Sequence, residues 1–171
     1  LIVYAPIGHG GCRLTPLYLM QGEGQILTFL KNWRTDTEAG RLLQIAVSWN
    51  QLHLGTSSCF LQDITSSLPH MPGRWLKSLR HFLAHINGSF ELDNSFLPPP
   101  QQQHDKYIMD LVLKSAAFSD PEIKQINYCR LYLKAITLSD TCNADGSTLD
   151  CSMLTGSPST TSSKSAWIHI H

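Results

Sequence analysis

The segment from Ser119 to Asp140, SDPEIKQINYCRLYLKAITLSD, constrains the fold more than any other part of the sequence. Ser119 can cap a helix, Pro121 suits the first turn, and Glu122 completes a Ser-x-x-Glu capping box. Apolar residues then recur every three or four positions and form two flanks of the same helix. The first flank is Ile123, Ile126, Cys129, Leu133 and Ile136, and the second is Tyr128, Leu131, Tyr132, Ala135 and Leu138. A helix that is apolar on most of its surface is normally buried, so we expect this one to be central.

One cation interrupts this apolar pattern. Arg130 is flanked by apolar positions, and a buried guanidinium needs polar partners. We therefore expect a carboxylate beside it, from Asp110 or Asp140. Cys129, the neighbouring residue, is interpreted as a small core residue and not as a nucleophile.

Four further helices are predicted upstream. The first begins at Thr15-Pro16, with a kink or break at Gly22 and Gly24, where glycine weakens a helix. The second follows a capping box at residues 35–38 and ends at Gly55. The third, residues 74–87, is the cleanest amphipathic helix, and the fourth spans residues 105–117. Their expected inward residues include Leu42, Leu43, Ala46, Val47, Trp49 and Asn50 in the second helix and Trp75, Leu76, Leu79, Phe82, Leu83 and Ile86 in the third.

Between the helices, residues 56–73 are rich in Ser, Thr and Pro and are predicted to be irregular, with Cys59-Phe60-Leu61 as a short buried anchor. Residues 1–5 and 89–92 are candidates for short strands. The fold class is therefore mainly α, an irregular bundle of about five helices with short strand or loop segments at the N-terminus and the C-terminus.

The chain divides into four predicted regions. Residues 1–97 form an N-terminal helical part with a glycine-rich entry turn, and residues 98–104, PPPQQQH, form a stiff spacer. Residues 105–140 form a C-terminal helical hairpin. Residues 141–171 form a turn-rich and partly mobile tail, because Ser, Thr, Gly and Asp dominate there.

Composition limits the classes of function. Charged residues make up 15% of the chain, against an average of about 25%, so we expect part of the surface to be covered by another part of a larger protein. The net charge is zero, which gives no global attraction to nucleic acid or membranes. No apolar run reaches the roughly 18 residues of a membrane span. The lack of a start methionine indicates a fragment, and five scattered cysteines without a CxxC pair indicate reduced thiols in an intracellular protein.

Basic residues provide the candidate site. Arg74, Lys77, Arg80 and His81 lie on the side of the third helix opposite its apolar face, where cations could follow phosphates. Lys31, Arg34 and Arg41 are further candidates. The alternative for all of them is an ordinary solvated face. The GHGG run at residues 8–11 lacks the ending of a phosphate loop and is interpreted as a turn.

Catalysis by this chain alone is not expected. No local signature pairs a cysteine with a histidine, and the sequence contains no adjacent aspartates. Asp105 and Asp110 are five positions apart and do not share a helix face. His169 and His171 could bind a metal only with further ligands, which the sequence does not supply nearby. We therefore expect no catalytic residue, no metal and no cofactor.

Several motifs together resemble one family. They are Gly10-Gly11, Gln21-Gly22 with Gln25, Trp75 to Leu83, Asp105 to Asp110, and Asn127 to Leu133. This order resembles the region downstream of the polymerase palm in reverse transcriptase-like proteins of retrotransposons, especially those of diatoms and other algae. The match departs at Cys12-Arg13, where that family more often has Leu-Gly. The Tyr-x-Asp-Asp metal site of the palm does not occur in this sequence.

The resemblance implies a thumb- or connection-like helical fragment of an RNA-directed DNA polymerase. Such a fragment would pack on the palm of the parent chain and support an RNA/DNA duplex through the basic residues named above, without catalysis. The alternative, from a different class, is a helical protein-interaction module with no nucleic-acid role.

Overall fold

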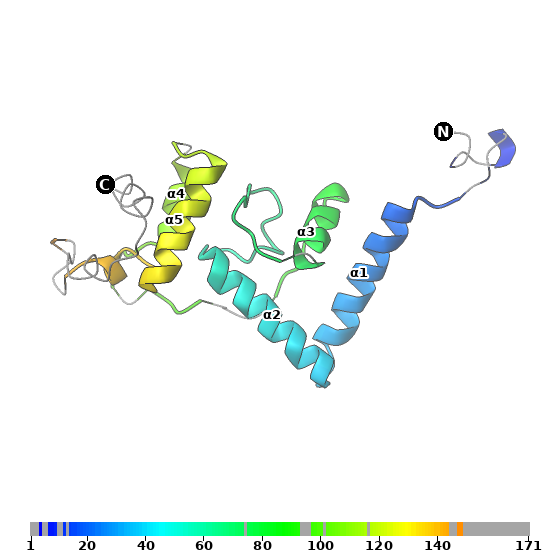
Figure 1. Cartoon of the computed structure of the whole chain (residues 1–171). Coiled ribbons are helices and arrows are strands. Elements are labelled where there is room, and N and C mark those ends of the chain that lie inside the picture. Colours follow the sequence, from blue (N-terminus) through cyan, green and yellow to red (C-terminus); the bar gives the residue numbers. More distant parts are fainter. Residues whose placement is uncertain are drawn as a thin grey trace.

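The computed structural model describes residues 4, 7–9, 12, 14–73, 75–92, 97–100, 102–115, 117–143 and 147–148. This part of the chain is mainly helical, as the sequence predicts, and it contains five α-helices (Figure 1). The helices are α1 (Leu17–Trp33), α2 (Glu38–Leu54), α3 (Trp75–His85), α4 (Ile108–Lys114) and α5 (Asp120–Leu133). Short 3-10 turns occupy Ile7–His9 and Ser139–Thr141. The β-pairing in the described residues is a single antiparallel bridge between Tyr107 and Thr137.

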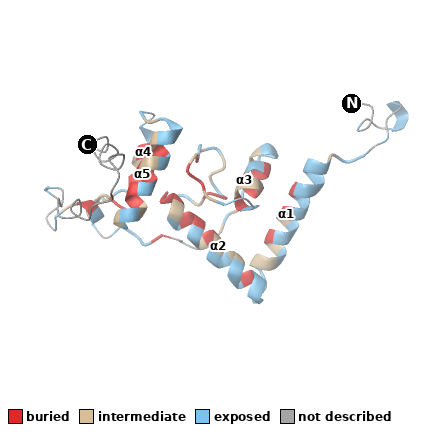
Figure 2. Ribbon diagram, viewed as in Figure 1, coloured by how far each residue is buried: buried red, intermediate tan, exposed pale blue. Residues whose placement is uncertain are grey.

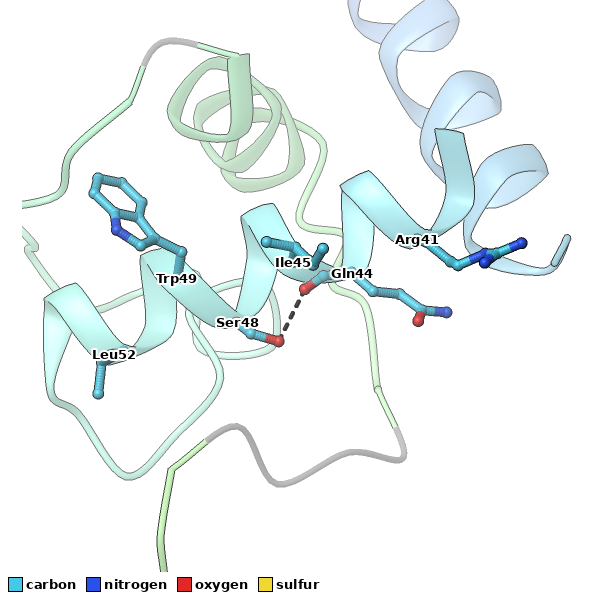
Figure 3. A pocket seen from close by; sticks show the side chains of 6 residues that line it. All are labelled: Arg41, Gln44, Ile45, Ser48, Trp49 and Leu52. Atoms are coloured by element: carbon cyan, nitrogen blue, oxygen red, sulfur yellow. Dashed lines mark hydrogen bonds between the residues drawn. The ribbon is translucent and has the colours of Figure 1, made fainter. Parts of the chain in front are cut away.

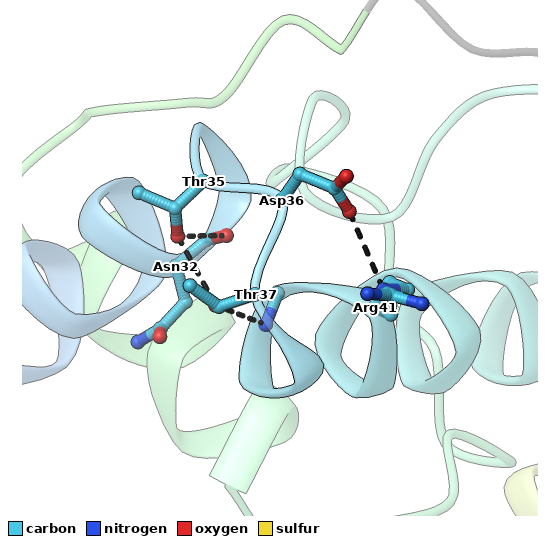
Figure 4. Close-up of polar contacts among 6 residues, drawn as sticks. Asn32, Thr35, Asp36, Thr37 and Arg41 are labelled. Atoms are coloured by element: carbon cyan, nitrogen blue, oxygen red, sulfur yellow. Dashed lines mark hydrogen bonds and ion pairs between the residues drawn. The ribbon is translucent and has the colours of Figure 1, made fainter.

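Helices α1 and α2 form the two arms of a V, and α3 lies between the arms (Figure 1). The turn that joins the arms is built from threonine side chains (Figure 4). Thr37 caps α2, since its hydroxyl accepts a hydrogen bond from the amide of Gly40 at 3.1 Å. Thr35 was the expected cap, but its hydroxyl donates to the carbonyls of Lys31 and Asn32 and closes the end of α1. The predicted capping box of Thr35 and Glu38 is therefore wrong, because Thr37 alone caps α2 and Gly40 has no side chain to return the bond. Helix α2 ends at Gly55 in the left-handed conformation as predicted.

Helix α1 is continuous, so the predicted break at its glycines is wrong. Pro16 occupies the cap position, one residue before the predicted place. Gly22 is buried against α3, and a Cβ atom there would lie 2.1 Å from the ring of Phe82. Gly22 lets α1 and α3 approach closely. The packing between the two helices compensates for the low helix propensity of glycine.

The two glycines of α1 predict opposite effects of the same substitution. Gly22→Ala should lower the free energy of unfolding by about 2 kcal/mol, because the methyl group overpacks the buried Phe82 ring. Gly24→Ala should raise it by about 1 kcal/mol, because a Cβ atom at Gly24 meets open space and alanine favours the helix. Urea unfolding of the two variants measures both values. Equal effects at the two positions would contradict the close α1–α3 contact.

The larger hydrophobic core lies inside the V. It joins α1, α2 and α3 to the loop that follows α2, and buried and exposed stretches alternate along each of these helices (Figure 2). Of the predicted anchor Cys59-Phe60-Leu61, Phe60 and Leu61 are buried as expected, and Cys59 is half-buried. The members of this core are Phe29, Val47, Leu54, Phe60, Leu61, Leu68, Met71, Leu76, Leu79 and Leu83.

Buried polar side chains order the irregular loop of residues 56–73. Gln51 projects from α2, and its amide donates to the carbonyl of Thr56 at 2.6 Å and to that of Ser58 at 2.9 Å. The Gln51 side-chain oxygen accepts from the amide of Phe60 at 3.2 Å. These bonds satisfy backbone groups that burial would otherwise leave unpaired.

The smaller core joins α4 and α5, which both lie within residues 105–140. Its buried residues are Ile108, Met109, Val112, Ile123, Ile126, Cys129 and Ala135. The capping box at the start of α5 is confirmed, with the Ser119 amide donating to the Glu122 carboxylate at 2.8 Å. Both helices are shorter than predicted. Helix α4 begins at Ile108, and α5 ends at Leu133, where Lys134 adopts the left-handed conformation.

Other expectations are corrected by the exposure of side chains. Tyr128 and Tyr132 are exposed, so the second apolar flank of α5 does not lie wholly in the core. In α2, Leu42 and Trp49 are exposed although the sequence predicted them inward, and in α3 Trp75 and Ile86 are also exposed. Residues 89–92 form no strand, although the amide of Phe90 donates to the carbonyl of Leu61 at 2.9 Å. The candidate strand at residues 1–5 lies almost entirely outside the described residues.

Polar contacts join the two cores. The amide of Ser57, just after α2, donates to the carboxylate of Asp110 in α4 at 3.1 Å. Leu113 packs against both cores. The remaining link runs from Arg130 of α5 to the end of α2, and it is the most buried polar contact between the two parts.

Candidate nucleic-acid interface and buried arginines

The basic residues predicted on the third helix are distributed over two environments. His81 is exposed and Lys77 is half-buried, and they lie one turn apart on α3. Arg74 lies outside the described residues. Arg80 is buried, so it does not belong to the exposed face on which the sequence placed it. The described candidates on α3 are therefore Lys77 and His81.

Arg80 instead fastens the loop after α2. Its Nε donates to the carbonyl of Phe60 at 2.9 Å, and its Nη2 donates to the carbonyls of Asp63 at 2.8 Å and Ser66 at 2.6 Å. Burial lowers the pKa of the guanidinium, and the charge of Asp63 opposes this shift. A guanidinium held by three carbonyls is a structural group, and a phosphate contact would require these bonds to break.

Asp63 stabilises the same loop through its carboxylate. Burial alone would raise the pKa of its carboxyl, but hydrogen bonds from the hydroxyls and amides of Ser66 and Thr65 together lower it. The carboxylate thereby holds the turn whose carbonyls receive Arg80. This interlocking pair explains how a Ser/Thr/Pro-rich segment is fixed on the core.

The second group of candidate cations surrounds the turn between α1 and α2. Lys31 and Arg34 are exposed at the end of α1, and Arg41 is exposed in the first turns of α2. The Nε of Arg41 lies 3.3 Å from a carboxylate oxygen of Asp36, with both side chains largely in solvent (Figure 4). Such an exposed pair contributes less than about 1 kcal/mol, so Arg41 can exchange this partner for another anion.

The two groups do not merge into one stripe. Lys77 and His81 belong to α3, which lies between the arms, whereas Lys31, Arg34 and Arg41 flank the apex of the V (Figure 1). The apex also carries the carboxylates of Asp36 and Glu38. The described candidates thus fall into two separate groups, and the apex group contains more cations.

Arg130 occupies a buried site between the two cores. Its Nη2 donates to the carbonyls of Leu52 at 3.1 Å and His53 at 2.8 Å, and to the Asn127 side-chain oxygen at 2.9 Å. The predicted carboxylate partner is wrong for both candidates. Asp110 accepts from the amide of Ser57, and Asp140 accepts from the amides of Ile136 and Thr137.

Arg130, which belongs to α5, caps the C-terminal end of α2. The last carbonyls of a helix have no intrahelical donor, and their partial negative charge favours a cation. The Arg130 guanidinium supplies both the donors and the charge. Burial lowers its pKa to about 10, so the group stays protonated at neutral pH.

Two histidines flank the same end of α2. His70 is buried, and its Nε2 lies 3.1 Å from the carbonyl of Leu54. Burial lowers the pKa of His70 to about 4, the charges of Arg130 and His53 add to the shift, and the bond to Leu54 opposes it. Burial and Arg130 also lower the pKa of His53. Within the described residues, neither ring has a hydrogen-bond partner at Nδ1.

Sequence patterns give a partial signal for these sites. Arg80 lies four positions after Leu76 and three before Leu83, at the edge of the apolar face, and this spacing could have placed it in the core. Arg130 was recognised as buried, but two of its partners are backbone carbonyls that are 77 and 78 positions away, and the nearby side-chain partner is the Asn127 amide and not a carboxylate. Gln51, Asp63 and His70 were missed because their roles depend on how the loop folds.

Other site chemistries find no support among the described residues. They contain no group of three or more His, Cys, Asp or Glu side chains that could hold a metal ion. The described helices are all too short or too polar to cross a bilayer. Burial raises the pKa of the Cys129 thiol, which disfavours the reactive thiolate. Comparison of the chain with protein-family models, curated proteins and solved structures finds no match.

Proposed function

We propose that this chain is a non-catalytic helical part of a retrotransposon reverse transcriptase that supports the template–primer duplex and packs on the palm of its parent protein. The basic apex of the V, formed by Lys31, Arg34 and Arg41, would contact the phosphate backbone. Lys77 and His81 of α3 would provide a second, smaller contact.

The exposed apex is the observation that carries this proposal. Its three cations end one helix and begin the next, and none is held by buried partners as Arg80 and Arg130 are. Long cationic side chains in solvent can reach phosphates without loss of internal hydrogen bonds. The order of sequence motifs described above supports the assignment to the reverse transcriptase region.

A protein-interaction module is the second candidate function. The exposed apolar side chains on the outer face of α2 favour it, because contiguous apolar surface commonly marks protein contacts. This function requires no duplex binding, so one binding experiment distinguishes the two candidate functions.

Binding of a fluorescent RNA–DNA duplex, followed by anisotropy over about 50 to 200 mM salt, tests the proposal. The full chain should bind with an affinity that falls steeply as salt rises. Replacing Lys31, Arg34 and Arg41 together by glutamine should weaken binding and reduce the salt slope by about 1 for each phosphate contact removed.

The matched control is Lys124→Gln, which removes an exposed cation from α5. It should leave both the affinity and the salt slope unchanged. If the full chain fails to bind the duplex even at the lowest salt, the nucleic-acid role is wrong. The same conclusion follows if the control and the triple variant behave alike.

A further inference from the structure

The face of α2 that points away from the core carries an apolar stripe. Leu42, Ile45, Trp49 and Leu52 are 59%, 63%, 52% and 42% exposed. They follow one another at i, i+3, i+7 and i+10, the spacing of a helix–helix seam. Because Val47 and Leu54 on the opposite side are completely buried, α2 is apolar on two sides. An apolar face in water is unfavourable unless something covers it.

The stripe borders a shallow hollow of about 590 Å³ (Figure 3). Arg41, Gln44 and Ser48 line it together with Ile45, Trp49 and Leu52. Two of its polar side chains have partners within the chain. The Ser48 hydroxyl donates to the carbonyl of Gln44 at 2.8 Å, and Arg41 pairs with Asp36. The ring of Trp49 leans on His53 of the same helix with a centroid distance of 5.2 Å. The face therefore offers shape and apolar area with little net charge.

We propose that this stripe is a homodimer interface in which α2 packs antiparallel against α2 of a second copy. The four positions are symmetric about Val47. An antiparallel pair related by a two-fold axis there places Leu42 against Leu52 of the other copy and Ile45 against Trp49. A two-fold interface requires this reciprocity, since each residue must meet the residue that meets it.

Charge favours the antiparallel direction. Arg41 stands at one end of the stripe, so antiparallel pairing separates the two copies of this cation by nearly the full length of the helix. Parallel pairing would set them side by side. Glu38 lies beyond the same end of the stripe, and between Arg41 and Leu54 the helix has no further Lys, Arg, Asp or Glu. The seam is thus free of like-charge contacts.

The available area indicates a weak dimer. A standard interface buries roughly 800 Å² on each partner, whereas four side chains that are about half exposed supply several hundred Å². That area lies at the low end of specific interfaces. The dimer should therefore dissociate in the micromolar range, which an equilibrium measurement can follow.

Sedimentation equilibrium of the full chain over the micromolar range tests the interface. The wild-type chain should show a reversible monomer–dimer equilibrium that moderate salt leaves unchanged. Ile45→Lys and Trp49→Glu should each be monomeric throughout, with unaltered helix content by circular dichroism because both sites are exposed. The matched control Leu27→Lys, at an exposed apolar position of α1, should dimerise like the wild-type chain.

Mixing the two monomeric variants tests the register. In an antiparallel pair, the lysine introduced at position 45 of one chain faces the glutamate introduced at position 49 of the other, and the opposite Trp49–Ile45 contact is retained. The mixture should therefore form a heterodimer. A wild-type chain that stays monomeric overturns the proposal, as does a Leu27→Lys variant that dissociates. A mixture that stays monomeric overturns the antiparallel register.

Discussion

Replacing Arg130 by methionine should lower the free energy of unfolding by about 4 kcal/mol. Methionine fills a similar volume, but it leaves the carbonyls of Leu52 and His53 and the side-chain oxygen of Asn127 without their donor. Each orphaned buried acceptor costs roughly 1–3 kcal/mol. Urea unfolding followed by circular dichroism measures the change.

The same substitution at an exposed arginine provides the control. Arg34 lies in solvent at the end of α1, so Arg34→Met should change the free energy of unfolding by less than about 0.5 kcal/mol. Arg130→Lys should fall between the two values, because an ammonium group keeps the charge but cannot reproduce the planar fork of donors. An Arg130→Met variant as stable as wild type would show that the link between the cores contributes nothing.

Gly55 allows a sharper measurement of the same contact. The residue has a φ of +67°, and a Cβ atom there would lie 2.7 Å from the central carbon of the Arg130 guanidinium. Gly55→Ala should therefore be more destabilising in the wild-type background than in the Arg130→Met background. We expect a coupling energy of about 1 kcal/mol in this double-mutant cycle. If the two changes in the free energy of unfolding are strictly additive, residue 55 and the Arg130 side chain do not interact.

Features set by neighbouring residues were predictable from the sequence. The capping box of Ser119 and Glu122 and the left-handed terminator at Gly55 appear where the pattern placed them. Both depend on bonds within one turn, so the sequence contains all the information they need. The mainly helical fold follows from the same local signals repeated along the chain.

Features that depend on distant partners were not predictable. Periodicity marks an apolar stripe but does not say which of two stripes faces the core, and Leu42 and Trp49 of α2 were assigned to the wrong one. Helix α5 ends early because the segment after it pairs with residues 106–108: the amide of Ile108 donates to the carbonyl of Ile136 at 3.1 Å, and the amide of Leu138 donates to that of Lys106 at 3.0 Å. Those bonds compete with helical ones only after the chain has turned.

The candidate site also combines features that the sequence predicts with features that depend on distant segments. Cationic residue types at helical spacing were visible in the sequence, and Lys31, Arg34, Arg41 and His81 are exposed. Arg80 and the partners of Arg130 depend on carbonyls presented by other segments. A carbonyl has no identity in the sequence, so apolar spacing can indicate that Arg80 or Arg130 is buried but cannot identify the backbone groups that it binds.

Acid should destabilise the chain between pH 6.5 and pH 4 because of His70. The pKa of this ring falls from its ordinary value of 6.5 to about 4 in the fold. Below pH 6.5 the unfolded chain takes up a proton that the folded chain does not, so stability is complete above pH 6.5 and is lost as the pH falls towards 4. The loss is roughly 3 kcal/mol, and His53 adds to it in the same direction.

Urea unfolding at neutral pH and at several steps down to pH 4 measures this loss. The carboxyls of Asp63 and Asp105 have lowered pKa values, so their contributions are lost mainly below pH 4 and overlap only the lowest step of this window. His70→Gln can still donate to the carbonyl of Leu54 but has no titrating group there. Its stability should fall much less over the same range, whatever its value at neutral pH. Equal slopes for the variant and the wild-type chain would place the acid sensitivity elsewhere, because only the His70 ring differs between them.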